Sequence, residues 1–358
     1  MALNPAVAAT RLAVRPHLRA LAAGGGAPLA LVACSGGVDS LALAAATAFE
    51  APRAGVRAGA VVVDHGLLEG SDRVARQAAA QCAALGLAPV TVETVQVPLH
   101  SGTGVEAAAR AARHAALDRA AGRAGAVVVL LAHTLDDQAE TVLLALARGA
   151  GATALAGMPP RRGRLVRPFL GVTRQETEAA VAAQGLEPWR DPTNEPGGPH
   201  PSLRAEVRAR VMPALIDTLG PGVPGALART AERLSADRDH LDAQAVALLA
   251  DAVSAAGGSA SGDGCVTLEL DVACLARAHP AISGRALRLA ALQAGAAPGA
   301  LAQSHIAALT ALVTRWHGQG AACLPGGIWA TRTCGKLVFR ASAGPIAPER
   351  QGEARGRS

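Results

Sequence analysis

The chain has 358 residues, a length that fits two or three domains and a core large enough for an enzyme. Aromatic side chains make up 2% of it, which argues against a binding surface of stacked aromatic platforms. The net charge is +6, and the only lysine, Lys336, is followed by Leu337. A Walker A phosphate site is therefore excluded, because it requires lysine followed by serine or threonine.

The positive charge is concentrated in two stretches that contain no acidic residue. Thr141–Gln175 holds six arginines, and Val272–Arg340 holds seven lysines and arginines. One such stretch is typical of an ordinary solvated face. Two of them favour a polyanionic partner such as nucleic acid.

Cysteine usage and hydropathy indicate the compartment. The six cysteines form no C-x-x-C pair and none stands at zinc-ligand spacing with histidine, so we expect reduced, buried thiols and a cytoplasmic protein. The N-terminus has no clean signal peptide. The uncharged stretches Ala20–Val38 and Leu289–Thr314 are interrupted by glycine and proline, so no membrane span is predicted.

The first half of the chain alternates strand-sized apolar runs with helical stretches. Strands are predicted at Pro28–Cys34, Gly59–Val63, Val90–Val97 and Ala126–Ala132, all before residue 135. Helices are predicted at Asp39–Phe49, at Arg73–Leu85, from a capping box at Thr103 and Glu106 to near Ala121, and at Asp136–Arg148 before Gly149. Apolar strands that alternate with helices predict an α/β fold with a doubly wound, Rossmann-like parallel sheet covered on both faces.

The second half predicts helices joined by longer loops. In chain order these are an arginine-rich loop at Gly151–Leu170, a helix at Thr173–Gln184, a loop at Trp189–Ser202, a basic helix at Leu203–Leu219, a hinge at Gly220–Gly225, a helix at Leu227–Val253, a loop at Ser254–Gly264, and helices near Ile282–Gly295 and Gln303–His317 mixed with short strands. The polar tail after Ala341 is expected to be disordered. We therefore divide the chain into a catalytic domain at 1–220, a smaller, mostly helical domain at 221–341 and a tail at 342–358.

A glycine-rich loop, Ser35–Ser40, joins the first predicted strand to the first predicted helix. Gly36 and Gly37 allow a tight turn and the close approach of an anion, while N–H groups, the helix dipole and the serine hydroxyls face that anion. The six residues, Val38 included, resemble the PP-loop of the ATP pyrophosphatases, enzymes that cleave ATP between its α- and β-phosphates. This resemblance implies ATP binding without a Walker lysine.

Asp39 stands among these donors, where a bare carboxylate would repel phosphates. One explanation is an acid that the helix dipole stabilises by about 0.3–1 kcal/mol. The other is a magnesium ligand, which we favour because the full loop is present.

A second acidic group follows the fourth predicted strand. Asp136 and Asp137 come directly after His133-Thr134-Leu135, at the carboxyl edge of the sheet. The two acids either cap the next helix or form a magnesium site opposite the Ser35–Ser40 loop. His133 is expected to orient or protonate the nucleotide.

Polar residues also follow the second strand and occupy the third helix. Asp64 and His65 end the second strand, at the edge where an open parallel sheet binds nucleotides, although an isolated Asp-His-Gly is more often a polar turn. Glu106, Arg110 and Arg113 share one helix face. They are either a surface Glu–Arg pair or two arginines that clamp pyrophosphate with Glu106 orienting them. Their positions leave both alternatives open.

Together these residues resemble the tRNA(Ile)-lysidine synthetase family. The most specific segment is AHTLDDQAETVLLALARGAGATALAGMPP at 132–160. Further matches are VDHG at 63–66, EAAARAARH at 106–114, Arg167-Pro168, WRDPTN at 189–194, Arg204 with Arg208 before Pro213, and LVTRWHGQG to LPGG at 312–327. The chain departs from the family pattern at His200–Leu203, where an aromatic residue is common, at Glu206, and at His114, where tyrosine or phenylalanine is common.

The resemblance implies an ATP-dependent ligation. The C2 carbonyl oxygen of the wobble cytidine in the CAU anticodon of tRNA(Ile) attacks the α-phosphate of ATP, pyrophosphate leaves, and the amine of free L-lysine then displaces AMP to form lysidine. The implied cofactors are ATP and Mg²⁺, and a homodimer is left open. The implied catalytic residues are Asp39, Arg110, Arg113, His133, Asp136 and Asp137; Ser35–Ser40, Asp64 and His65 would bind ATP, Asp39 and Asp137 the metal, and Glu106, Arg204 and Arg208 the substrate.

Two alternatives remain. A PP-loop tRNA thiolase would deliver sulfur instead of lysine, but such enzymes commonly need a C-x-x-C cluster or a persulfide cysteine. Cys34, directly before the loop, is expected to end a buried strand. A non-catalytic nucleotide- or RNA-binding module would have no use for three costly acids, Asp39, Asp136 and Asp137.

Overall fold

The computed structural model describes residues 3–66, 70–96, 105–190, 203–257 and 266–341. The predicted cap at Thr103, most of the loop before Leu203, most of the loop before Val266 and the polar tail lie outside these ranges. None of the described helices is both long and apolar enough to cross a membrane. The described cysteines are all free.

Contacts within the chain divide it into two compact units, Met1–Ser235 and Ala236–Ser358. The division falls inside one helix, α10 (Val223–Ala255). Each unit has its own sheet and its own hydrophobic core.

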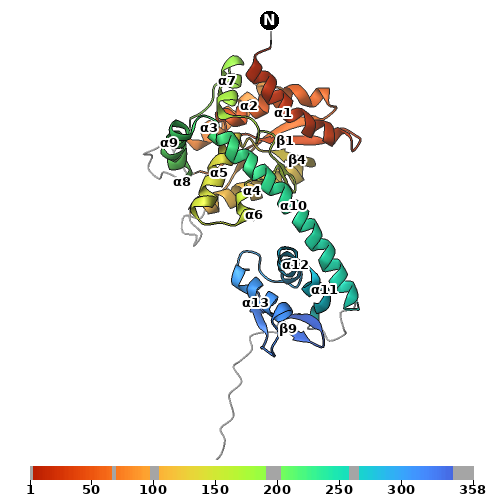
Figure 1. The fold of residues 1–358 in the computed structure, drawn as a ribbon. Helices are drawn as coiled ribbons and strands as arrows, with labels where there is room; N and C mark the ends of the chain where they lie inside the picture. The colour runs from red at the N-terminus through yellow and green to blue at the C-terminus, as the bar shows by residue number, and fades with distance from the viewer. Residues whose placement is uncertain (1–2, 67–69, 97–104, 191–202, 258–265, 342–358) are drawn as a thin grey trace, which may run out of the picture. The chain divides into compact units, whose positions relative to one another are not determined.

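The first unit is built on a six-stranded sheet in the order β3-β2-β1-β4-β6-β5. Its neighbouring strands β1 and β4 are labelled in Figure 1. Its strands are β1 (Leu29–Ala33), β2 (Arg57–Asp64), β3 (Val90–Thr94), β4 (Ala126–Leu130), β5 (Arg161–Arg162) and β6 (Leu165–Val166). All neighbours pair in parallel except the edge strand β5. The predicted parallel sheet is confirmed. The prediction that every strand precedes residue 135 is wrong, because β5 and β6 form a hairpin too short to leave a periodic pattern.

Helices cover both faces of this sheet because successive strand side chains point in opposite directions. The helices are α1 (Pro5–Ala22), α2 (Val38–Arg53), α3 (Ser71–Ala84), α4 (Val105–Ala124), α5 (Leu135–Ala147), α6 (Ala152–Leu155) and α7 (Arg174–Ala183). Ala30 and Val32 of β1 join the core under α1, α2, α3 and α7, whereas Leu29 and Leu31 join the core under α4. The sequence analysis did not predict α1, although Val14 and Leu18 on its buried stripe are fully buried.

The predicted basic helix is a continuous helical run with one irregular turn. It consists of α8 (Leu203–Glu206), a π-helical turn (Val207–Val211) and α9 (Met212–Leu219). Gly220, with φ +95°, separates this run from α10. The hinge is shorter than predicted, because α10 already begins at Val223 and proline at the next position fits a first helical turn.

The second unit contains a four-stranded antiparallel sheet in the order β7-β10-β9-β8. The strands are β7 (Val266–Asp271), β8 (Ala322–Leu324), β9 (Ile328–Thr333) and β10 (Lys336–Ala341), and the helices after α10 are α11 (Val272–Arg277), α12 (Pro280–Gln293) and α13 (Gln303–Thr314). Leu270, Leu287, Leu309 and Phe339 are fully buried between them. The predicted helices and short strands are confirmed, and helices contribute more of this unit than strands.

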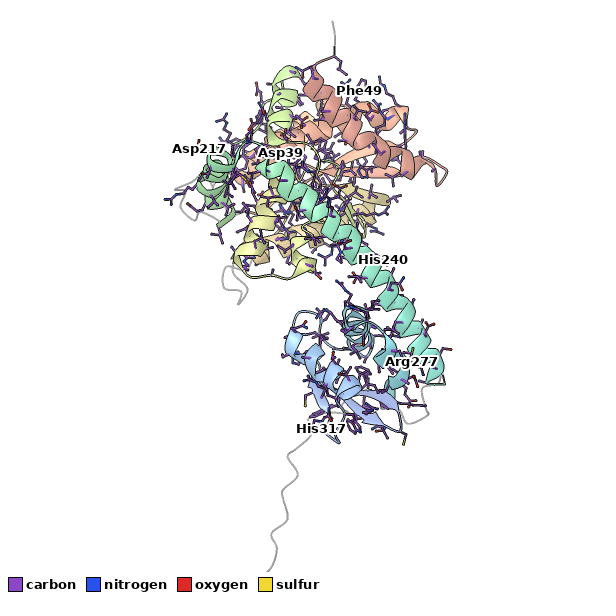
Figure 2. All side chains as sticks on the ribbon, viewed as in Figure 1. Asp39, Phe49, Asp217, His240, Arg277 and His317 are labelled. Carbon is purple, nitrogen blue, oxygen red and sulfur yellow. The ribbon has the colours of Figure 1, made fainter. Side chains whose placement is uncertain are left out.

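The parallel strands place the candidate residues at one edge. β1 and β4 are neighbours, and the chain leaves them toward α2 and α5 at the point where the strand order reverses. Such a switch point is where open α/β sheets bind ligands. Asp39 lies at this end of α2, whereas Phe49 lies near its other end (Figure 2).

Candidate active site

The loop after β1 is held by its own serines. Ser40 Oγ accepts a hydrogen bond from the Ser35 N–H at 3.2 Å and donates one to the Gly37 carbonyl at 2.9 Å. Gly36 has φ +83°, and a Cβ there would lie 3.1 Å from the Cβ of Ala78. No side chain caps the N-terminus of α2, which begins directly after the loop. Hydrogen bonds within the loop therefore hold its shape, and the helix N–H groups are available to an anion.

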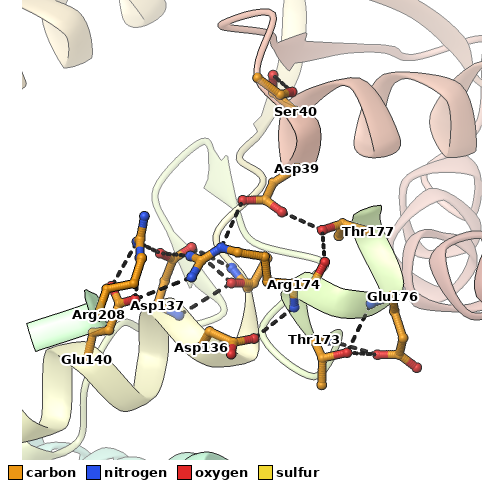
Figure 3. Close-up of polar contacts among 12 residues, drawn as sticks. Asp39, Ser40, Asp136, Asp137, Glu140, Thr173, Arg174, Glu176, Thr177 and Arg208 are labelled. Atoms are coloured by element: carbon orange, nitrogen blue, oxygen red, sulfur yellow. Dashed lines mark hydrogen bonds and ion pairs between the residues drawn. The ribbon is translucent and has the colours of Figure 1, made fainter. Parts of the chain in front are cut away.

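Asp39 lies in the first turn of α2 and faces α7 (Figure 3). Its Oδ1 accepts a hydrogen bond from the Thr177 hydroxyl, and its Oδ2 lies 3.9 Å from Arg174 Nε. Burial raises the pKa of Asp39, and the carboxylate of Asp137 adds to this, while Thr177 and Arg174 only partly offset it. A carboxylate in this environment gains stability from a further cation.

Asp137 has two tasks, one for each carboxylate oxygen. Its Oδ2 accepts the Thr134 backbone N–H at 2.9 Å, and the Asp137 N–H donates to Thr134 Oγ1 at 3.3 Å, so the pair forms a capping box for α5. Its Oδ1 accepts from Arg174 at 3.0 Å and from Arg208 at 3.1 Å. Burial works against ionisation, but these arginines and the Thr134 N–H prevail and lower the pKa of Asp137. The helix-cap alternative is therefore confirmed for Asp137, and the magnesium site stays a prediction.

Asp136 is oriented differently from its neighbour. Its Oδ2 accepts the backbone N–H of Arg174 at 2.8 Å, at the start of α7. This contact ties α5 to α7 and favours a structural role for Asp136.

A buried glutamate completes the site. Glu140, 1% exposed, accepts a bidentate pair from Arg208, with 2.7 Å from Nε to Oε1 and 2.9 Å from Nη2 to Oε2. Arg174 Nη1 lies 3.4 Å from the same carboxylate. Arg204 donates to the Thr141 hydroxyl at 2.8 Å. We call Asp39, Asp137, Glu140, Arg174, Arg204 and Arg208 the acid–arginine network.

No role was predicted from the sequence for Arg174, Thr177 and Glu140. Glu140 stands three residues after Asp137, which puts both on one face of α5. That spacing could have indicated Glu140. Nothing local indicates Arg174 or Thr177, because α7 reaches the site only through tertiary packing.

A second group of polar side chains includes His133 and carries positive charge. Its members, which we call the cation cluster, are Arg110, Arg113, His114, His133, Arg162 and Arg167. Burial, with further contributions from Arg167, Arg113 and Arg110, lowers the pKa of His133 to about 3, against the opposing effect of Asp137. A ring with this pKa is neutral near pH 7 and has no extra proton to give. Of the two roles predicted for His133, the pKa therefore favours orienting the nucleotide and not protonating the nucleotide.

Arg110 and Arg113 of α4 are brought toward the same edge as His133. The helix follows β3 and therefore begins at the carboxyl edge of the sheet. Burial and the charges of Arg110 and Arg204 lower the pKa of Arg113. The described part of the chain supplies no carboxylate partner for Arg113. Glu106 lies on α4, but its side chain falls outside the described part, so its predicted orienting role stays a prediction.

Asp64 lies at the end of β2, also at the carboxyl edge. It is 8% exposed, and its Oδ1 accepts the Gly66 N–H at 3.0 Å. This is the polar turn that an Asp-His-Gly sequence predicts. His65 follows it at the same edge.

The arrangement suits chemistry on a nucleoside triphosphate. A preformed phosphate loop lies beside carboxylates held by arginines, and a separate set of cations faces the same edge. Charge that develops on phosphates can be stabilised from both sides, which is the main catalytic requirement of adenylyl transfer.

Comparisons with known proteins agree with this arrangement. The profile of the PP-loop domain matches residues 13–215, and that of the TilS substrate binding domain matches residues 270–337. The tRNA(Ile)-lysidine synthase of Salinispora arenicola is 53% identical, covering 94% of this chain and 97% of its own, and that of Thermobifida fusca is 49% identical over 94% and 98%. The chain belongs to the tRNA(Ile)-lysidine synthase family. It is therefore an enzyme of the PP-loop, ATP-binding class.

A solved structure supports the fold of the first unit. The U34-tRNA thiolase of Methanococcus maripaludis has a TM-score of 0.52 at 18% identity, covering 64% of this chain and 80% of its own. This likeness concerns the fold alone. The thiolase alternative is not favoured, because the lysidine synthase relatives match at far higher identity and over nearly the full length.

Proposed function

We propose that the chain uses ATP to join free L-lysine to C2 of the wobble cytidine in the CAU anticodon of tRNA(Ile), with release of AMP and pyrophosphate. Family membership supports the reaction. The observation that carries the assignment to this edge is that Asp39 and Asp137 share Arg174 beside the Ser35–Ser40 loop. In the first step the C2 oxygen attacks the α-phosphate, and in the second the lysine amine displaces AMP.

The ATP phosphates are assigned to the loop of Ser35, Gly36, Gly37, Val38 and Ser40. Its N–H groups and hydroxyls stabilise charge as pyrophosphate departs. Asp64 and His65, at the neighbouring strand end, are assigned to the nucleoside side. His133, kept neutral, orients the nucleotide.

Magnesium is assigned to Asp39 and Asp137. Mg²⁺ commonly takes one or two protein carboxylates and fills its other positions with water and phosphate oxygens, and these two acids fit that donor set. The raised pKa of Asp39, caused first by burial, supports the fit, because a cation would relieve it. When bound, the metal would supply positive charge to the phosphates. Arg174 meanwhile holds both carboxylates toward each other.

Arg110 and Arg113 are assigned to pyrophosphate, with Glu106 orienting them. Arg204 and Arg208 are assigned to substrate binding, at the positions where they donate hydrogen bonds to Thr141 and Glu140.

We place the enzyme in the cytoplasm, where its tRNA and lysine are found. A homodimer is a further hypothesis, which a measurement of the protein's mass in solution tests.

The domains are proposed to divide the work, with 1–220 catalysing the reaction and 221–341 docking the tRNA. The described part of the second unit carries Arg277, Arg285, Arg288, Arg315 and Arg332 on or near its surface. Removing residues after Ser235, the end of the first compact unit, should leave the ATP-binding sheet folded. It should also remove most tRNA affinity. The logarithm of the remaining affinity should fall less steeply with the logarithm of salt concentration, because each phosphate contact contributes roughly 0.7–0.9 to that slope. Unchanged affinity and slope would place the tRNA on the arginines of 148–174 instead.

The decisive experiment is mass spectrometry of nucleosides from tRNA(Ile) incubated with protein, ATP and lysine. Lysidine in place of one cytidine, dependent on both ATP and lysine, is the expected result. A thiolated base formed with a sulfur donor would support the thiolase alternative. Nucleotide binding without any modified base would support a non-catalytic module.

A further inference from the structure

Arg167 is a buried cation that pairs with no carboxylate of the residues the structure describes. It follows β6, its side chain is 3% exposed, and its Nη1 donates to the Pro159 carbonyl at 2.9 Å. Its Nε is buried and has no hydrogen-bond partner. Among the described residues no carboxylate pairs with it. Burial, together with the charges of Arg110, Arg162 and Arg113, lowers its pKa to about 10.

The pairing of the strands fixes where this guanidinium lies. Val166 of β6 is level with Leu130 of β4, and the Leu131 N–H donates to the Val166 carbonyl at 2.8 Å. Arg167 is the next residue, so it stands at the carboxyl edge beside the segment that leads to His133. Its own N–H donates to the Pro160 carbonyl at 2.8 Å, which anchors the backbone.

Two more buried polar atoms in this cluster lack partners, His114 Nε2 and His133 Nδ1. Burial, followed by the charges of Arg110, Arg113, Arg167 and Arg162, lowers the pKa of His114 to about 4. Buried polar groups are nearly always hydrogen-bonded, and a buried charge is normally paired. Three buried polar atoms without a partner, set among several cations, therefore point to this place as a site for an anion.

We propose that Arg167 is the buried anchor of a phosphate-binding site, with Arg162 at its rim and His114 as a further hydrogen-bond donor. The proposal rests on the proposed function in one respect: the phosphate is the pyrophosphate released from ATP or a phosphodiester of the bound RNA. Both present the same tetrahedral oxygens, which a guanidinium fork binds in bidentate fashion.

The number of cations selects phosphate over a simple carboxylate. A carboxylate carries one charge, whereas pyrophosphate or successive RNA phosphates carry several. Arg162 belongs to the edge strand β5 and is exposed, so it can meet a ligand that enters from solvent. Arg167 serves as the fixed contact, because its Nη1 and its backbone N–H donate to the carbonyls of Pro159 and Pro160.

The test is direct binding by the full chain, without lysine or turnover. Inorganic pyrophosphate and, separately, an anticodon stem-loop RNA are titrated calorimetrically into wild type, Arg167→Met and Arg162→Gln. Arg164→Met is the matched control, because Arg164 lies in the same hairpin but is half exposed and pairs with Asp118 at 3.6 Å. We expect Arg167→Met to weaken one of the two ligands at least tenfold, Arg162→Gln to weaken the same ligand about threefold, and Arg164→Met to leave it unchanged.

The ligand that loses affinity identifies the phosphate source. Unchanged affinity for both ligands in Arg167→Met and Arg162→Gln would overturn the proposal, as would an equal loss in Arg164→Met. If Arg167→Met does not fold, the Arg162→Gln measurement decides alone. A chain that binds pyrophosphate through Arg167 but makes no lysidine would keep this site and refute the proposed function.

A second readout separates ligand contact from a structural role. In wild type, the ligand should raise the pKa of His114 from about 4, because the anion stabilises the protonated ring. An NMR titration of the His114 ring measures this pKa. In Arg167→Met that upward shift should be largely lost. A shift of equal size in both proteins would contradict the assignment of Arg167 as the anchor.

Discussion

The acid–arginine network and the cation cluster lie at the same edge of the sheet but balance their charges differently. In the network, Glu140 and Asp137 accept hydrogen bonds from Arg174 and Arg208, so the carboxylates and guanidiniums satisfy one another. In the cation cluster, Arg113, Arg162 and Arg167 have no carboxylate partner within the described ranges. The carboxylates and guanidiniums of the first group pair largely with one another, whereas Arg167 of the second group is the residue proposed to pair with an anion.

This difference predicts opposite responses to substitution. Removing a charge from the network should cost stability, because it leaves a buried partner unpaired. Removing a charge from the cation cluster should cost ligand binding, with stability unchanged or improved. Asp39 stands between these cases, since it belongs to the network but has a raised pKa.

The largest expected effect is that of Asp39→Asn on turnover. The substitution removes the charge assigned to magnesium while keeping the hydrogen bond to Thr177, so lysidine formation should fall by about 10²-fold or more with the fold intact. Steady-state assays and circular dichroism measure the two quantities. Asp118→Asn, at an exposed position on α4, is the control. Near-normal ATP–pyrophosphate chemistry in Asp39→Asn would refute the magnesium role.

Glu140→Gln should produce the largest loss of stability. It leaves the Arg208 guanidinium without its bidentate partner at a position where Glu140 is 1% exposed, so the free energy of unfolding should fall by about 3–5 kcal/mol. Denaturant unfolding at constant pH measures this. The exposed Glu178 of α7 offers a control in Glu178→Gln. A loss no larger than that of the control would mean that the network is not the balanced group described.

Arg113→Gln should separate binding from stability. We expect ATP–pyrophosphate exchange to fall about tenfold or more, tRNA affinity to change less, and the unfolding midpoint to stay or rise, because one repelling charge is gone. Arg119→Gln, at an exposed position of the same helix, is the matched control. Normal ATP kinetics with weakened tRNA binding would reverse the assignment.

The smallest effect concerns His114 and pH. Burial holds the pKa of His114 near 4, below its ordinary value of 6.5, so as the pH falls the unfolded chain takes up this proton first. Stability should therefore decline between about pH 6.5 and pH 4, and His114→Asn should decline less. Unfolding midpoints at about pH 7 and pH 5 test this. Equal declines in both proteins would show that His114 does not titrate in this way.

The sequence predicted the parts of the molecule whose signal is local. The four longer strands, their helices and the Ser35–Ser40 loop each have a periodic or glycine pattern, and each was found. The hairpin of β5 and β6 was missed because two-residue strands have no period. Glu140 was missed because its burial depends on Arg208, 68 residues away in the chain. Arg174 was missed for the same kind of reason, since only tertiary packing brings α7 against Asp39 and Asp137.

α10 sets a limit on how the chain can be recombined. Ala231 is buried before the division at Ser235, and Ala245 and Ala252 are buried in the core of the second unit. Ala245 and Ala252 are seven residues apart, about two helical turns, so both lie on one face of α10. One residue inserted between them would turn Ala252 by about 100° and take it away from the core that Ala245 enters. A chimera joined inside α10 therefore has to keep the spacing of this apolar face residue for residue.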